Sequence, residues 1–157
     1  MGSRPPFHFQ GGTMSAIISF SGPFRFLSNF YLSRIVVDSI IYNSVENYFQ
    51  AQKAEDPAMR THIRNAAPSQ AKVLGRKAML VEGWELKKKF VMKTAVYHKF
   101  VQNEDLLSLL RGTGRAYLIE GNNWHDNYWG ACWCAQCKTL EHKNMLGTLL
   151  MEVRREL

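Results

Sequence analysis

The residues from 122 to 130 concentrate side chains that could do chemistry. They supply an imidazole, a carboxylate, three aromatic rings and several amides, and they end in Gly130. A segment that only fills a core would not gather so many groups that need hydrogen-bond partners. Rings for stacking and a carboxylate for acid–base work predict the wall of a pocket for a flat, polar ligand. The candidate site residues are Asp126, Tyr128 and Trp129, with Gly130 allowing close approach of the backbone.

A second candidate group is Glu46, Gln50 and Lys53. Their spacing of i, i+4 and i+7 places all three on one face of a predicted helix. A carboxylate, an amide and an amine on one stripe could bind a sugar hydroxyl, orient water, or stabilise or attack a cationic carbon. The structural alternative is a capping box formed by Asn43 and Glu46, with Lys53 as an ordinary solvated lysine.

The aromatic and acidic candidates also have structural interpretations. Asp126 would cap a turn and Trp129 would pack on the core. Trp84, which follows Gly83 at the start of a predicted helix, is a third candidate for stacking on a ligand. Its alternative role is that of a core anchor.

Three cysteines, Cys132, Cys134 and Cys137, fall within six positions. With His125 or His142 as the fourth ligand they would complete a tetrahedral structural zinc site, which would staple a loop rather than catalyse a reaction. The alternative is a set of reduced cysteines without a metal.

The composition bounds the remaining possibilities. The 157 residues, 46% of them hydrophobic, suit one domain with a substantial core. The net charge of +7 favours nucleic acid or phosphorylated small molecules as partners, although solvated basic faces would give the same count. The sequence has neither a membrane span nor a signal-peptide pattern, and its clustered cysteines do not suggest a disulfide framework. We therefore expect a cytoplasmic protein that does not associate with membranes.

The elements that must position these residues are mostly helical. Residues 1–13 have the composition of a flexible leader or expression remnant, and 14–157 form the predicted domain. β-branched runs predict strands at 17–20, 34–37, 40–42 and 117–120, with a hairpin at Asp38-Ser39 and a loop through Gly22-Pro23. Predicted helices run from a cap at Asn43 to about Ala54, over 57–65, 69–79, 83–102 and 104–110, and along the stripe of Leu146, Leu149, Leu150, Val153 and Leu157. The predicted fold class is α+β, a mostly helical single domain with a small β-sheet.

These motifs together resemble the NADAR (YbiA-like) family. The resemblance runs from about Phe20 to the C-terminus and is carried by Phe26–Phe30, Tyr42–Lys53, Gly83-Trp84, Lys99-Phe100, Leu118–Glu120, Asp126–Gly130 and Asn144–Met151. It implies an N-glycosidase that removes ADP-ribose from guanine bases of DNA or RNA. One alternative that it implies is an N-glycosidase acting on phosphorylated intermediates of riboflavin synthesis. A non-enzymatic alternative is a zinc-stapled module that binds nucleic acid.

The resemblance also implies roles for the candidate residues. Glu46 would supply negative charge, Lys53 a general acid or a covalent nucleophile, and Asp126 a second acid–base group or a ribose clamp. Substrate contacts would come from Asn29, Gln50, Trp84, Tyr128, Trp129 and Gly130. This scheme requires no cofactor. The cysteine cluster departs from the family, because some relatives have a glycine-rich loop before Asn144.

Overall fold

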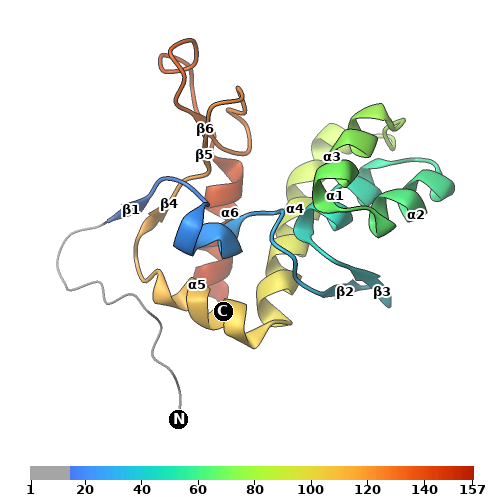
Figure 1. The fold of residues 1–157 in the computed structure, drawn as a ribbon, viewed down its shortest axis with the longest axis horizontal. Coiled ribbons are helices and arrows are strands. Elements are labelled where there is room, and N and C mark those ends of the chain that lie inside the picture. Colours follow the sequence, from blue (N-terminus) through green and yellow to red (C-terminus); the bar gives the residue numbers. More distant parts are fainter. Residues whose placement is uncertain (1–14) are drawn as a thin grey trace. The chain divides into compact units, whose positions relative to one another are not determined.

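A computed structural model describes residues 15–157, and the predicted leader at 1–13 lies outside the described residues. The chain forms two compact units (Figure 1). One unit consists of Asn29–Asn103, and the other of the residues up to Ser28 together with Glu104–Leu157. About half of the described residues lie in helices, which confirms the mixed, mostly helical fold class.

The Asn29–Asn103 unit begins with the predicted hairpin. Strands β2 (Ile35–Val37) and β3 (Ile40–Tyr42) pair antiparallel. Asp38 and Ser39 have φ angles of 51° and 65°, so both central residues of the turn are left-handed. This conformation suits the right-handed twist of the flanking strands and explains why the hairpin is so tight.

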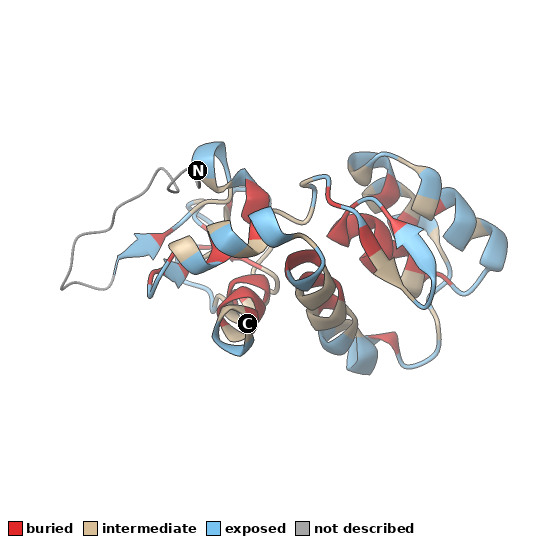
Figure 2. Cartoon of the chain, turned by 90° about the horizontal axis from the view of Figure 1, so that it is seen from below, coloured by how far each residue is buried: buried red, intermediate tan, exposed pale blue. Residues whose placement is uncertain are grey.

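Helix α1 (Val45–Lys53) packs against α2 (Pro57–Asn65), α3 (Pro68–Lys77) and α4 (Trp84–Val101). Seven consecutive residues of α1, from 45 to 51, are buried (Figure 2). The buried polar side chains of this helix must find hydrogen-bond partners inside the protein.

The predicted N-cap of α1 at Asn43 was wrong by one residue. The N-cap is Ser44, whose hydroxyl accepts from the Asn47 amide at 3.1 Å and donates to Asn47 Oδ1 at 2.5 Å. Asn43 still belongs to the end of the hairpin, because its carbonyl accepts from the Ser33 amide at 2.8 Å. Glu46 therefore does not take part in a capping box, which was the structural alternative to a catalytic role for this residue.

The other helices follow the predictions closely. Helix α2 has the predicted bounds, α3 is displaced by one or two residues at its ends, and α4 lacks one predicted residue at each end. Helix α5 (Glu104–Gly112) and helix α6 (Met145–Glu156) belong to the second unit. Leu157 is the C-cap of α6 rather than a helical residue.

The strands of the second unit differ most from prediction. β1 (Ala16–Ile17) pairs in parallel with β4 (Tyr117–Leu118), so both are shorter than predicted. β5 (Gly121–Asn122) and β6 (Ala131–Cys132), which also pair in parallel, were not predicted. The described residues thus hold three two-stranded sheets instead of one small sheet. The predicted loop at Gly22 is a 3-10 helix, η1 (Gly22–Leu27), with Pro23 in its first turn.

Helix α6 lies very close to strand β4. A Cβ atom on Gly147 would come within 2.0 Å of the Leu118 carbonyl oxygen, so only glycine fits there. The Asn144 side chain donates to that carbonyl at 2.8 Å and accepts from the Glu120 amide at 3.0 Å. The buried leucines and valine of the predicted stripe face inward. This accounts for the Asn144 and Gly147 positions of the family motif as packing and hydrogen-bonding requirements.

Within residues 15–157, no helix combines the length and apolar character needed to cross a membrane.

Replacement of Asn47 by alanine should destabilise the protein. Asn47 Nδ2 donates to the carbonyls of Ile63 and Ala66, at 2.9 and 2.8 Å, and so satisfies the C-terminal end of α2. Loss of these bonds should lower the free energy of unfolding by about 2–3 kcal/mol, measured by urea denaturation. The exposed neighbour Asn43→Ala is the matched control and should stay within about 0.5 kcal/mol of wild type. Equal stability of both variants would contradict the role given to Asn47.

Candidate active site

The predicted stripe on α1 is joined by hydrogen bonds. Gln50 Nε2 donates to Glu46 Oε1 at 2.8 Å, and Lys53 Nζ donates to Gln50 Oε1 at 3.4 Å. The amide of Gln50 thus connects the carboxylate to the amine with each of its two polar atoms. The helical spacing correctly placed the three residues on one face.

Burial changes the ionisation of both ends of this stripe. Glu46 and Gln50 are each 6% exposed, and Lys53 is half-buried. Burial raises the pKa of Glu46, although the Gln50 hydrogen bond and the nearby Lys72 and Lys53 oppose the shift. Burial lowers the pKa of Lys53, against the opposing charge of Glu46. The pKa of the carboxyl group is thus raised and that of the amine is lowered. Groups shifted in these directions are suited to acid–base or nucleophilic chemistry near neutral pH.

Basic side chains from α3 add positive charge around Glu46. Lys72 and Arg76 both act on Glu46 electrostatically, together with Lys53. Three cations near one buried carboxyl group give this region a positive balance, which suits an anionic ligand.

Gly75 on α3 is a site residue that the sequence analysis missed. A Cβ atom at this position would lie 1.8 Å from Gln50 Oε1. Gly75 therefore leaves the space in which Gln50 connects Glu46 to Lys53. A glycine inside a predicted helix was the available signal, since such a glycine often marks a close approach.

Trp84 and Asn29 were predicted to contact the substrate. The Trp84 ring is 6% exposed and lies 5.1 Å from the Phe49 ring, centroid to centroid, which is the position of a core anchor. Asn29 Nδ2 donates to Met92 Sδ at 3.6 Å, and its carbonyl accepts from the Glu46 amide at 3.1 Å. Asn29 thus helps to fix the start of α1, and substrate contacts by either residue stay predictions.

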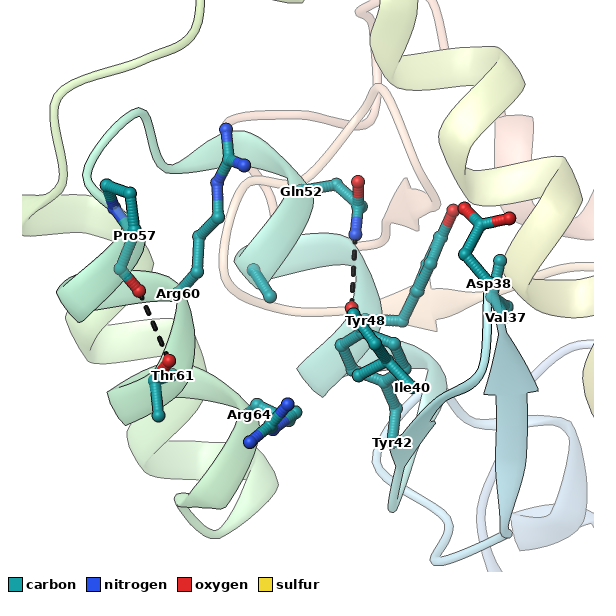
Figure 3. Close-up of a pocket in the computed structure, with 11 residues that line it drawn as sticks. Val37, Asp38, Ile40, Tyr42, Tyr48, Gln52, Pro57, Arg60, Thr61 and Arg64 are labelled. Atoms are coloured by element: carbon teal, nitrogen blue, oxygen red, sulfur yellow. Dashed lines mark hydrogen bonds between the residues drawn. The ribbon is translucent and has the colours of Figure 1, made fainter.

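The other face of α1 borders a pocket of about 310 Å³ (Figure 3). Tyr48 and Gln52 line it from α1, and Arg60 and Arg64 from α2. None of the predicted site residues lines this pocket. It is therefore separate from the Glu46 stripe.

Asp126 has a structural role within the second unit. Its Oδ1 atom accepts from the Tyr128 amide at 3.1 Å and from the Trp129 amide at 2.9 Å. This is the turn-capping arrangement that was the structural alternative for this residue. A catalytic role for Asp126 stays a prediction.

Tyr128 and Trp129 are half-buried and meet edge to face, with ring centroids 4.7 Å apart. The Lys143 ammonium lies 5.6 Å from the centre of the Tyr128 ring. Gly130 was expected to let the backbone come close to another group, and in the structure that group is the backbone of Glu120. A Cβ atom there would lie 2.1 Å from the Glu120 carbonyl oxygen.

The backbone of residues 127–130 holds the start of α6. The carbonyls of Asn127, Tyr128, Trp129 and Gly130 accept from the amides of Lys143, Met145, Leu146 and Asn144, respectively, at 2.8 to 3.2 Å. The first amides of a helix lack partners within the helix, and here the motif supplies them. This connection was not foreseen from the sequence, since nothing local links the two segments.

The three cysteines lie together with a histidine that the structure identifies as His125. One ligand atom from each of the four residues lies within 4.8 Å of the others, so the group could hold a metal ion. His142, the other candidate, instead bonds through Nδ1 to Asn127 Oδ1 at 2.7 Å.

Lys99, like Gly75, is a residue for which the sequence analysis predicted no role. Its side chain is 1% exposed, and burial lowers its pKa to about 7. The ammonium nitrogen lies 5.6 Å from the centre of the Tyr31 ring and 5.2 Å from that of Phe100. No sequence pattern predicted this burial, because lysine side chains in helices normally face solvent.

Comparisons with known proteins agree with the family resemblance. The family model described as NADAR domain matches residues 19–157. The chain is 37% identical over 153 residues to N-glycosidase YbiA of Shigella boydii, covering 96% of this chain and 92% of that protein. It is 34% identical over 135 residues to a riboflavin biosynthesis protein of Vibrio vulnificus, covering 84% of this chain and 35% of that protein. The NMR structure of Escherichia coli YbiA matches with a TM-score of 0.79 and 37% identity, covering 95% of this chain and 87% of that chain.

Glu46→Gln should stabilise the folded protein at neutral pH. A carboxyl group whose pKa is raised on folding favours the folded state at pH values below its ordinary pKa. That contribution is lost as the pH rises through the raised value. Glutamine does not ionise, so the variant does not lose stability as the pH rises. Its melting temperature should therefore exceed that of wild type near pH 7, and the difference should vanish near pH 4.

The control is the exposed carboxylate variant Glu82→Gln. Melting temperatures of all three proteins between pH 4 and 8 provide the measurement. A Glu46→Gln effect of the same size at both ends of this range would contradict the raised pKa.

Proposed function

This chain belongs to the NADAR domain family, and on that premise we propose that it hydrolyses N-glycosidic bonds. The observation that carries the proposal is the buried Glu46–Gln50–Lys53 stripe, in which a carboxyl group of raised pKa and an amine of lowered pKa share one amide. Relatives whose names identify them as N-glycosidases support the same chemistry.

The proposed substrate is ADP-ribose attached to guanine in DNA or RNA. Both parts of this substrate are polyanionic, and the net charge of +7 favours such a ligand. Locally, the cations of Lys72 and Arg76 near Glu46 suit the diphosphate. The second candidate is a phosphorylated N-glycoside of riboflavin synthesis, which the similarity to a riboflavin biosynthesis protein favours.

Glu46 acts on the sugar in this proposal. Cleavage of the bond between ribose C1 and the base nitrogen passes through a ring with oxocarbenium character. A carboxylate beside that ring stabilises its positive charge and holds a ribose hydroxyl or the attacking water. The Gln50 hydrogen bond fixes the Glu46 side chain, so little reorganisation is needed when the charge develops.

Lys53 offers a covalent route. A neutral amine attacks ribose C1 while the bond to the base breaks, and the base leaves with the electron pair and takes up a proton. Ring opening then gives a Schiff base, and water hydrolyses it to the free sugar and the amine. The lowered pKa of Lys53 increases the neutral fraction available for this attack.

The remaining predicted residues keep their proposed roles. Asp126 is proposed as the second acid–base group or ribose clamp, and Trp129 and Tyr128 as stacking surfaces. No cofactor takes part in the proposed bond cleavage. The protein is proposed to act in the cytoplasm.

A DNA oligonucleotide carrying ADP-ribose on guanine should lose that group when wild-type protein is added. Intact mass spectrometry follows the reaction, and Glu46→Gln should lose at least about a hundredfold in rate, as is usual when a charge-stabilising group is removed. Glu82→Gln is the control and should react at the wild-type rate.

An unchanged oligonucleotide together with cleavage of the phosphorylated riboflavin intermediates would shift the assignment to the second substrate. Cleavage of neither substrate, with salt-dependent binding of the oligonucleotide, would favour the non-enzymatic nucleic-acid-binding alternative.

Borohydride should trap a sugar adduct on wild-type protein during turnover. Reduction converts the Schiff base into a stable secondary amine, and peptide mass spectrometry should locate the added mass on Lys53. Lys53→Ala should give no adduct, whereas the exposed control Lys77→Ala should give as much as wild type. Turnover by wild type without any trapped adduct would instead assign Lys53 to acid catalysis.

A further inference from the structure

The four side chains of His125, Cys132, Cys134 and Cys137 form a cluster that the proposed hydrolysis does not use. His125 Nδ1 lies 3.2 Å from Cys137 Sγ and 3.5 Å from Cys134 Sγ. The His125 backbone amide donates to Cys132 Sγ at 3.4 Å. All three thiols therefore converge on one histidine.

The cluster has the dimensions of a tetrahedral metal site. Zinc bonds of about 2.3 Å to sulfur and about 2.05 Å to nitrogen place tetrahedral ligands about 3.6–3.8 Å apart. The two nitrogen–sulfur distances of 3.2 and 3.5 Å are close to this value, and all four ligand atoms lie within 4.8 Å of one another. These four ligand atoms are close enough together to hold one ion.

His125 also has an unfavourable backbone conformation. Its φ angle is 67°, in the left-handed region that a residue with a side chain seldom adopts. Strain of this kind persists where the surroundings compensate for it, and it marks functional positions. Here the conformation accompanies a ring nitrogen that lies against the thiols.

We propose that His125, Cys132, Cys134 and Cys137 bind one structural zinc ion. Three thiolates and one imidazole are the soft, tetrahedral ligand set that zinc uses in structural sites, and they leave no open position for a substrate. The thiols release their protons as the metal binds.

The zinc would tie together elements that are weak alone. β5 and β6 are two residues each, and a pair of this size is not stable by itself. His125 follows β5, Cys132 ends β6, and the Cys137 amide donates to the Cys134 carbonyl at 3.1 Å in the turn beyond. A metal bound to all four residues would therefore fix the loop that contains Asp126, Tyr128 and Trp129.

Metal analysis of the purified full-length protein tests this proposal. We expect one zinc ion per chain by inductively coupled plasma mass spectrometry. His125→Ala and Cys134→Ser should each lose most of it, while His142→Ala should keep it. His142 is the matched control, because it follows the cysteines in the chain and its Nδ1 bonds to Asn127 instead of the thiols.

Two measurements on wild-type protein do not depend on folding of the variants. Iodoacetamide should leave all three cysteines unmodified until a chelator removes the metal, and chelation should lower the melting temperature. Cobalt added to the chelated protein should give the visible bands of a tetrahedral thiolate site.

Several outcomes would overturn the proposal. Wild-type protein that contains no zinc and binds neither zinc nor cobalt would do so, and so would a mass lower by two hydrogens, which indicates a disulfide within the cluster. Loss of zinc in His142→Ala as complete as in His125→Ala would refute the assignment of the fourth ligand.

Discussion

The burial of polar side chains on α1 is the constraint on which the Asn29–Asn103 unit depends. Glu46, Asn47 and Gln50 are nearly or fully buried, and each would be costly without a partner. Their partners come from neighbouring elements: Asn47 bonds to the carbonyls at the end of α2, and Gln50 occupies the space left by Gly75 on α3. Among residues 15–157, no buried polar side-chain atom lacks a partner. The requirement to satisfy α1 therefore determines where α2 and α3 can pack.

The same constraint shifts the pKa values of Glu46 and Lys53. Apolar side chains could have held α1 in place without the free-energy cost of removing a carboxyl group from water. Packing alone therefore does not explain why Glu46 is buried there. Burial raises the pKa of Glu46 and lowers that of Lys53, and the intervening amide keeps the two in contact. Groups kept in such an environment are typical of active sites.

Sequence patterns predicted those helices and strands that neighbouring residues specify. Pro57 after the Asp56 cap, the β-branched runs on either side of Asp38-Ser39 and the leucine stripe of α6 each specify an element without help from distant residues. The parallel strands β5 and β6 were not predicted, because strands of two residues carry no periodicity. The N-cap of α1 was misplaced because Asn43 and Ser44 are both good caps, and the choice depends on the contact of Asn43 with Ser33.

The candidate site was only partly accessible to sequence reasoning. Spacing placed Glu46, Gln50 and Lys53 on one face, and the cysteine spacing identified three of the four clustered residues. The choice of His125 over His142 depends on a left-handed backbone angle and on the bond from His142 to Asn127, neither of which is visible in the sequence. The role of Gly75 depends on the packing of α3 against α1, and the burial of Lys99 depends on residues distant in sequence such as Tyr31, so neither is visible in one sequence.

The hydrogen bonds between residues 127–130 and the start of α6 have a consequence for how this protein can evolve. The segment from 131 to 142 begins with β6, and the chain returns at Lys143 and Asn144, whose amides donate to the carbonyls of Asn127 and Gly130. A loop whose two ends are fixed to each other can gain, lose or exchange residues without displacing the elements that it joins. Changes in the length or sequence of the part of this segment beyond β6 should therefore leave α6 and the aromatic motif in register.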